Sequence, residues 1–218
     1  MQYMLTPYTK IPVPWAWWEG AFTEAELDWL QLQAKNATIQ AEVGGDDNKG
    51  EINKSNRRSQ VAWLRNAPSN EWVFTKLAHV ASKSNADNFG FDLTGFGEPL
   101  QLTNYDQAEN GMYGWHQDGT SGICRKLSMA IQLTDPEQYI GGDLQVQLLD
   151  GTATTVKRQR GFITIFPSYT LHQVTPVTQG SRQSLVAWVS GPPFKGIQNI
   201  LSILHYLKTC IRKATVSI

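Results

Sequence analysis

Short runs in which apolar and polar residues alternate dominate the chain between residues 99 and 190. Successive side chains of a β-strand face opposite sides, so such runs predict strands that bury one face. The turns between them carry Gly, Asn, Asp and Pro, which favour chain reversal. Eight runs can be read: PLQLTNY, MYGWHQ, KLSMAIQL, GDLQVQLL, ATTVKR, GFITIF, LHQVTPV and RQSLVAWVS. The pattern predicts a mainly β fold with flanking helices, an antiparallel sandwich or barrel of which the jelly roll is the eight-strand form.

The first 98 residues show a different pattern. Thr23 and Glu26 fit a capping box, which predicts a helix over residues 24–35. Apolar positions at helical spacing predict a second helix within residues 71–90, and TIQAEVG and QVAWL read as short strands. The polar, glycine-bearing stretch at 44–59 has no period and predicts a long loop, which is usually a functional lid or a disordered segment.

After residue 194 the spacing of apolar residues predicts one more amphipathic helix, over 195–218, packed on the sheet or used as a dimer contact. We therefore expect a single domain over 1–218. Its parts are helical support and a loop (1–98), a β core (99–194) and the C-terminal helix (195–218).

Charge and composition narrow the function. The 19 basic and 19 acidic residues balance, which gives no general electrostatic reason to bind nucleic acid or an anionic membrane. The two cysteines form no metal-binding or disulfide pattern, so a reducing compartment is expected. We see no signal peptide and no apolar stretch of transmembrane length, and these observations predict a cytoplasmic protein that is a monomer or a homodimer.

Within the β region, His116 and Asp118 are two positions apart and share one face of an extended strand. The pair is either a plain His–Asp hydrogen bond or two corners of a metal site. Of the four histidines, His79 and His205 fall in predicted helices, and only His172 lies in a strand of the same region. Two histidines and one carboxylate, with the other positions open, are the ligand set of non-haem Fe(II) oxygenases.

Two strands add a wall of polar groups. Alternation places Arg182, Ser184, Val186 and Trp188 on one face of the last run. An arginine beside a metal can bind one end of a dicarboxylate whose other end chelates the ion. In KLSMAIQL the Ser128, Ala130 and Gln132 face is too small and polar for an ordinary core, which leaves two readings, a ligand pocket or a solvent-facing side.

Together these motifs resemble the 2-oxoglutarate- and Fe(II)-dependent dioxygenases, especially the prolyl 4-hydroxylase group with its bacterial PKHD-type members. The resemblance covers residues 101–194. Its blocks are Tyr105, Gly111, Tyr113, His116 and Asp118; Asp135-Pro136 with Gly141-Gly142-Asp143-Leu144; Phe166-Pro167, Leu171-His172 and Val174; and Arg182 with Trp188.

The resemblance implies a double-stranded β-helix (jelly roll) that binds Fe(II) through His116, Asp118 and His172. It implies 2-oxoglutarate as cosubstrate, with ascorbate as a candidate further cofactor, and hydroxylation of a C–H bond with release of succinate and CO2. The distal carboxylate of 2-oxoglutarate would pair with Arg182. The other expected cosubstrate neighbours are Tyr105, Ser128, Gln132, Val174 and Trp188. Gln132 departs from the tyrosine that many prolyl hydroxylases carry there.

The substrate is the open question. A prolyl residue in a peptide or protein is the leading expectation; a free amino acid or small metabolite and, further behind, a nucleobase are alternatives. Arg57 and Arg58 in the 44–59 loop, together with Tyr113, are candidate substrate contacts, and solvated charges on the loop are the other reading of the two arginines. A jelly-roll binding module without catalysis is the rival from a different class. The carboxylate of Asp118 argues against the related halogenases, in which a small residue stands at that place.

Overall fold

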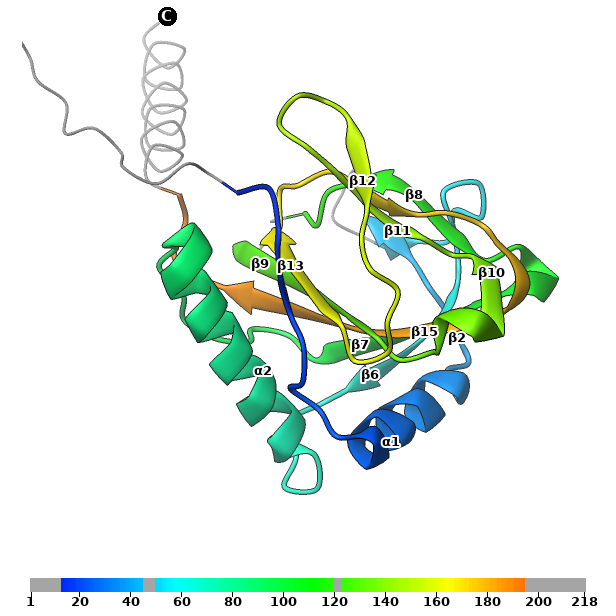
Figure 1. Cartoon of the computed structure of the whole chain (residues 1–218), viewed down its shortest axis with the longest axis horizontal. Coiled ribbons are helices and arrows are strands. Elements are labelled where there is room, and N and C mark those ends of the chain that lie inside the picture. Colours follow the sequence, from blue (N-terminus) through cyan, green and yellow to red (C-terminus); the bar gives the residue numbers. More distant parts are fainter. Residues whose placement is uncertain (1–12, 45–49, 120–122, 195–218) are drawn as a thin grey trace, which may run out of the picture.

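The computed structural model describes residues 13–44, 50–119 and 123–194 (Figure 1). Two β-sheets face each other, and two helices cover the outer side of the larger sheet. The architecture is mainly β and matches the predicted jelly roll. The helix predicted over 195–218 lies outside the described residues, and the single-domain assignment stays a prediction.

The larger sheet forms one side of the space between the two sheets. All its pairings are antiparallel, and burial is nearly continuous along the central strands β9 and β7 and along the C-terminal part of β15. Its order is β1 (Ala16–Trp18), β13 (Ile163–Pro167), β9 (Arg125–Gln132), β15 (Val177–Ser190), β7 (Leu100–Asp106), β6 (Gln60–Leu64) and β2 (Ile39–Gln40), with β10 (Tyr139–Gly141) also paired to β15.

The smaller sheet faces the larger sheet. Its order is β12 (Ala153–Thr155), β11 (Leu144–Gln147), β14 (His172–Val174), β8 (Met112–His116) and β5 (Arg57–Arg58). A separate hairpin joins β3 (Val43–Gly44) to β4 (Gly50–Glu51). The pairing of β8 with β14 brings together residues that are more than fifty positions apart in the chain.

Helix α1 (Glu24–Lys35) begins as the sequence predicts. The Thr23 hydroxyl accepts from the backbone N–H of Glu26, and the Glu26 carboxylate accepts from the backbone N–H of Thr23, so the capping box is complete. Helix α2 (Glu71–Ser84) continues into a π-helical turn, η1 (Asn85–Phe89). Short 3₁₀ turns, η2 (Gln107–Glu109) and η3 (Pro136–Gln138), follow β7 and precede β10. No described helix has both the length and the apolar character that crossing a membrane requires.

Strand β9 separates the two cores by its alternation. Leu127, Met129 and Ile131 point to the core beneath the helices. Ser128 and Ala130 point to the space between the sheets, and both are buried. The solvent-facing reading of this face is therefore wrong, because the face lines a cavity; the binding of a ligand there stays a prediction.

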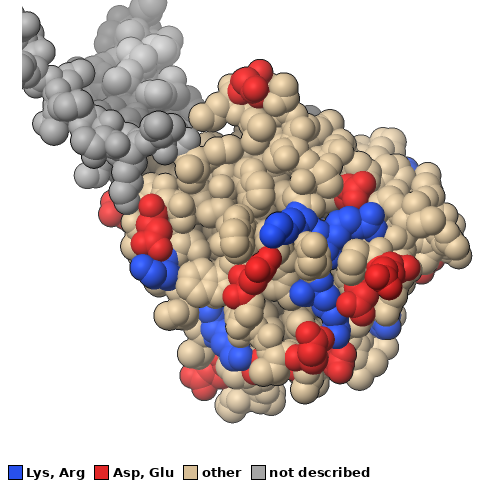
Figure 2. All heavy atoms as spheres, viewed as in Figure 1, with Lys and Arg blue, Asp and Glu red and all other residues tan. Residues whose placement is uncertain are grey.

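The prediction of a structureless loop over 44–59 is wrong in its described part. Residues 50–51 pair with β3, and residues 57–58 form an edge strand on β8. The strands β1 and β10 were not predicted at all. On the face shown in Figure 2, basic and acidic side chains are interspersed, as expected for a chain with balanced charge.

Candidate metal centre

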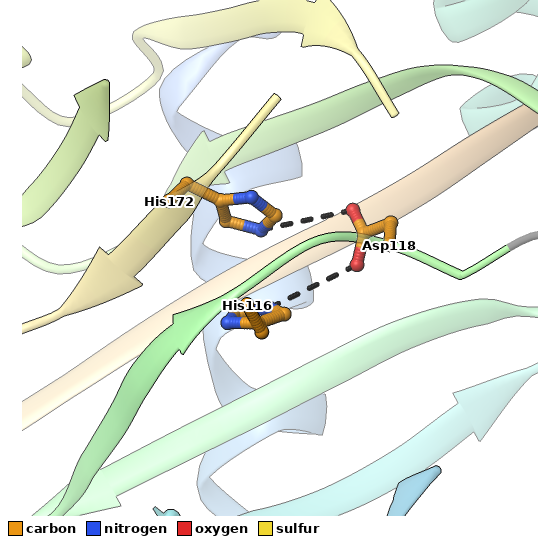
Figure 3. A group of neighbouring side chains, drawn as sticks. All are labelled: His116, Asp118 and His172. Atoms are coloured by element: carbon orange, nitrogen blue, oxygen red, sulfur yellow. Dashed lines mark ion pairs between the residues drawn. The ribbon is translucent and has the colours of Figure 1, made fainter. Parts of the chain in front are cut away.

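Three potential ligands meet at the end of the smaller sheet (Figure 3). His116 is the last residue of β8, and His172 is the first residue of β14. The strand register pairs these two positions directly. Asp118 follows two residues after His116, and its backbone N–H donates to the carbonyl of Ser168, which holds the carboxylate beside the histidines.

The three side chains converge closely. The Asp118 Oδ1 atom lies 3.9 Å from His116 Nε2, and Oδ2 lies 3.7 Å from His172 Nε2. The ligand atoms of all three residues lie within 4.8 Å of one another. The two imidazole centroids are 4.1 Å apart. This is the predicted two-histidine, one-carboxylate arrangement, with all three groups directed at a common point.

Backbone carbonyls fix the tautomer of both histidines. His116 Nδ1 lies 2.8 Å from the carbonyl oxygen of Gly114, and His172 Nδ1 lies 2.9 Å from that of Thr170. A carbonyl only accepts hydrogen bonds, so each Nδ1 carries a proton and donates it. Each Nε2 therefore keeps a free lone pair on the side of Asp118. Ligating histidines are usually oriented in this way by the hydrogen bond of the other ring nitrogen.

The electrostatics of the site favour the protonation states that bind metal. Burial, followed by the neighbouring His172, lowers the pKa of His116 to about 3, although the Asp118 carboxylate opposes the shift. Burial alone would raise the pKa of Asp118, but the two histidines and the Ser128 hydroxyl outweigh it and hold that pKa below its usual value. At neutral pH the site presents a neutral imidazole at position 116 and a carboxylate at position 118. A divalent cation needs such ligands.

Two buried hydroxyls support the carboxylate. Ser128 Oγ donates to Asp118 Oδ2 over 2.5 Å, and the Ser168 oxygen lies 3.0 Å from Ser128 Oγ. Both serines are fully buried. The bond occupies Oδ2 of the carboxylate. Ser128, expected from the resemblance as a cosubstrate neighbour, thus contacts the metal-ligand carboxylate directly.

A cavity of about 600 Å³ opens beside the three ligands, between the two sheets. This volume is typical of a small-molecule site. One lining residue has a buried donor without a hydrogen-bond partner among the described residues, Nη1 of Arg182. Unpaired buried donors are costly, so such a cavity fits a ligand that brings oxygen acceptors.

Arg182 lines this cavity and is 1% exposed. Its Nε and Nη2 donate to the Gln132 side-chain oxygen over 3.1 and 2.9 Å, and its guanidinium lies over the Tyr105 ring at 5.5 Å. Gln132 is neutral, and the ion pairs of the described residues do not include Arg182. The arginine therefore keeps an uncompensated charge, and the site fits the distal carboxylate of 2-oxoglutarate.

The structure brings most of the predicted residues to one cavity. Besides the three ligands, those that line it are Arg57, Tyr105, Tyr113, Ser128, Val174, Arg182 and Trp188. Gln132 reaches it through Arg182. Arg58 is outside the lining, since its guanidinium donates to the backbone oxygens of Asn110 and Lys54. The binding roles of all these residues stay predictions.

Residues that the sequence did not single out complete the mouth. Arg125 forms a two-pronged ion pair with Glu98 over 2.6 Å contacts, and its guanidinium lies 4.0 Å from the centroid of the Trp188 ring. Trp63 packs near the same ring at 6.4 Å. No motif signals these contacts, because they join positions far apart in the chain.

Known proteins are similar to this chain in sequence. Residues 100–190 match the family model of the 2OG-Fe(II) oxygenase superfamily. A PKHD-type hydroxylase from Teredinibacter turnerae is 35% identical over 86 residues, which are 36% of this chain and 38% of that protein. One from Cupriavidus metallidurans is 38% identical over 94 residues, 38% of this chain and 41% of that protein. The matched segments span about two fifths of these relatives, and they confirm the resemblance to the PKHD-type group.

Solved structures extend the similarity to the whole fold. A prolyl-4-hydroxylase from Pseudomonas putida superposes with a TM-score of 0.64 at 18% identity and covers 83% of this chain and 94% of its own. A prolyl hydroxylase from Trichoplax adhaerens, in complex with a hypoxia inducible factor peptide fragment, superposes with a TM-score of 0.66 at 14% identity, covering 81% and 83%. At these identities the likeness establishes the shared fold.

Proposed function

We propose that this protein is an Fe(II)- and 2-oxoglutarate-dependent dioxygenase that hydroxylates a C–H bond. The observation that carries the proposal is the placement of His116, Asp118 and His172 in one cavity with the uncompensated guanidinium of Arg182. A metal-binding module without catalysis would have no use for a second, buried and uncompensated cation that lines the same cavity. When bound, metal and cosubstrate supply the oxidising chemistry: one oxygen atom of O2 goes to the substrate and one to succinate, with loss of CO2.

The protein residues have separate tasks. The two histidines and Asp118 hold the ion through Nε2 and carboxylate oxygen atoms. Arg182 orients the cosubstrate by pairing with its distal carboxylate, a bidentate geometry that a guanidinium favours. The buried cavity walls exclude water from the reacting atoms.

The leading substrate is a prolyl residue in a peptide or protein. Two findings support it: the relatives matched by sequence are named PKHD-type hydroxylases, and one structural neighbour is a prolyl hydroxylase in complex with a peptide. The mouth of the cavity also exposes apolar side chains, Ile39, Trp63 and Ile123, that suit contact with an extended chain. A free amino acid or small metabolite is the alternative.

The test is turnover with a matched ligand variant. The protein is loaded with Fe(II) and incubated with 2-oxoglutarate, O2 and panels of proline-containing peptides and free amino acids, with and without ascorbate. Succinate and a substrate mass gain of one oxygen are measured together. The proposal expects both products with at least one panel and neither in His172→Ala. Failure to bind metal, or equal succinate from His172→Ala, would contradict it; product only from the amino-acid panel would replace the peptide assignment.

A further inference from the structure

The imidazole of His116 lies face to face with the ring of Tyr113. Their centroids are 3.4 Å apart and the planes differ by 16°. The two residues are three positions apart on β8, whose burial pattern is intermediate around them. His172 has a looser neighbour, the Phe166 ring, at 4.6 Å and 54°. One of the two histidines is therefore held by parallel stacking and the other only by a tilted contact.

Arg57 closes the stack from the other side. Its guanidinium carbon lies over the Tyr113 ring, 4.5 Å from the centroid. Because the imidazole occupies one face of that ring at 3.4 Å, the guanidinium lies on the opposite face. The strand register explains the placement, since β5 pairs with β8 and sets Arg57 opposite Tyr113. A cation over an aromatic face is attracted by the ring quadrupole.

Three neutral acceptors fix the guanidinium. Its Nε donates to Ser59 Oγ over 3.0 Å, Nη1 to the backbone oxygen of Glu42 over 3.2 Å, and Nη2 to the Gln101 side-chain oxygen over 2.7 Å. Arg57 is only 6% exposed. Every nitrogen of the group already donates to the protein. Arg57 is therefore fixed in the wall of the cavity, whereas the sequence left solvated charges on a loop as one reading of this residue.

We propose that Arg57 and Tyr113 are positioning residues for His116. A hydrogen bond from Nδ1 to Gly114 fixes one atom of the imidazole and leaves the ring free to tilt about that bond. The stack removes this freedom, because Tyr113 covers the face of the ring and Arg57 prevents Tyr113 from moving away. Nε2 is thereby kept on the common point of the three ligands before any ion binds. The inference rests on the proposed function in one respect, that His116 is a metal ligand.

The stack gives β5 a second purpose. Strand β5 is two residues long at the edge of the smaller sheet, and short edge pairings alone hold weakly. The cation–ring contact and the three hydrogen bonds of Arg57 join this edge to the metal ligand. The segment that the sequence reads as a loop is therefore part of the frame of the metal site.

The experiment measures Co(II) affinity and the Co(II) visible absorption band, neither of which requires turnover. Tyr113→Leu removes the ring, Tyr113→Phe keeps it, Arg57→Gln removes the cation, and Arg57→Lys keeps the charge without the planar fork. Arg58→Gln is the matched control, because Arg58 is the neighbouring residue on the same strand and lies outside the cavity lining. Folding of each variant is checked by circular dichroism and thermal melting without metal.

We expect Tyr113→Leu to weaken Co(II) binding by about 10- to 100-fold and to shift the band, the range typical of lost outer-shell support. Arg57→Gln should show the same change to a smaller degree, and Arg57→Lys should recover only part, since the ammonium lacks the planar stacking face. Tyr113→Phe and Arg58→Gln should match the wild type in both readouts. A variant that only loosened the fold would lower the melting temperature and leave the band of the folded, loaded protein in place.

Two results would overturn the proposal. If Tyr113→Leu folds and keeps the wild-type Co(II) affinity and absorption band, the Tyr113 ring has no positioning role. This variant keeps the hydrogen bonds of Arg57, so it still tests the proposal if Arg57→Gln does not fold. Wild-type values in Arg57→Gln or in Arg57→Lys would remove the guanidinium from it. Absence of Co(II) binding in the wild type is a different outcome, because it would refute the proposed function itself.

Discussion

Replacing Arg182 by alanine separates cosubstrate binding from metal binding. The guanidinium is 1% exposed, faces no carboxylate among the described residues, and keeps Nη1 without a partner. It is not a metal ligand. If it pairs with the distal carboxylate of 2-oxoglutarate, Arg182→Ala leaves that carboxylate buried and unpaired.

The structure sets the expected size of the loss. Removing one partner of a buried, hydrogen-bonded charge pair costs about 2–5 kcal/mol. At about 1.4 kcal/mol per tenfold, this is roughly a 30- to 5000-fold weaker apparent affinity for 2-oxoglutarate. A separate cost falls on folding, because the Gln132 oxygen loses both of its donors. An unsatisfied buried acceptor costs about 1–3 kcal/mol and appears as a lower melting temperature of the ligand-free protein.

Calorimetric titration of the Mn(II)-loaded protein with 2-oxoglutarate, without O2, measures the effect directly. Arg182→Lys should recover part of the affinity, because it keeps the charge and loses the fork. A monocarboxylic 2-oxo acid has no distal carboxylate, so its affinity should fall much less in Arg182→Ala. Unchanged 2-oxoglutarate affinity in Arg182→Ala, with Mn(II) binding intact, would refute the assignment of Arg182 as the anchor.

Three further changes test other parts of the site. Ser128→Ala removes the hydroxyl that donates over 2.5 Å to the ligand carboxylate, so Co(II) affinity should fall by about 10- to 100-fold; an unchanged dissociation constant would show that the bond does not support the metal. The metal-free protein should gain stability as pH rises from about 3 to 6.5, because the unfolded chain binds a proton at His116 that burial denies to the folded state; chemical denaturation at stepped pH should show this slope, and it should be shallower in His116→Gln. Gly142→Ala places a Cβ 2.9 Å from Val177 Cγ2 and 3.1 Å from Arg182 Cδ at φ +64°, whereas Gly151→Ala at φ +84° meets nothing within 4 Å. Both variants should lose stability from the left-handed backbone, and only the first should also weaken 2-oxoglutarate binding in the same titration.

Alternation along the chain was sufficient to predict the β core. All eight predicted runs contain a strand of the structure, and the two faces of β9 divide as expected. The strands that were missed are too short for a period to emerge: β4 and β5 have two residues each, and β1 and β10 have three. Strands β1 and β10 form only because their neighbours, β13 and β15, offer free edges.

The ligand triad was also within reach of the sequence through its residue types and spacing, although strand β8 ends at His116 and Asp118 is held beside it by the hydrogen bond to Ser168 and not by strand alternation. The residues that contact those ligands could not be predicted from the sequence. Parity puts Ser128 on the cavity face but says nothing of its bond to Asp118, which depends on how β9 lies against the segment after β8. Likewise, two adjacent arginines in a polar stretch look equivalent. Only the register of β5 against β8 sends Arg57 into the wall and Arg58 to its exterior.

The difference between the metal-side wall and the rim of the cavity indicates which residues determine substrate specificity. The metal-side wall is fixed by strand pairing and by hydrogen bonds to backbone carbonyls, so its side chains have little freedom to adapt to different substrates. The rim is different. Ile39, Trp63 and Ile123 keep 37–56% of their surface exposed and contribute apolar area at the mouth. If the proposed function holds, substitutions at the rim should change which substrate is accepted and should alter metal and cosubstrate affinities less, because these three side chains are partly exposed whereas Arg182 is 1% exposed.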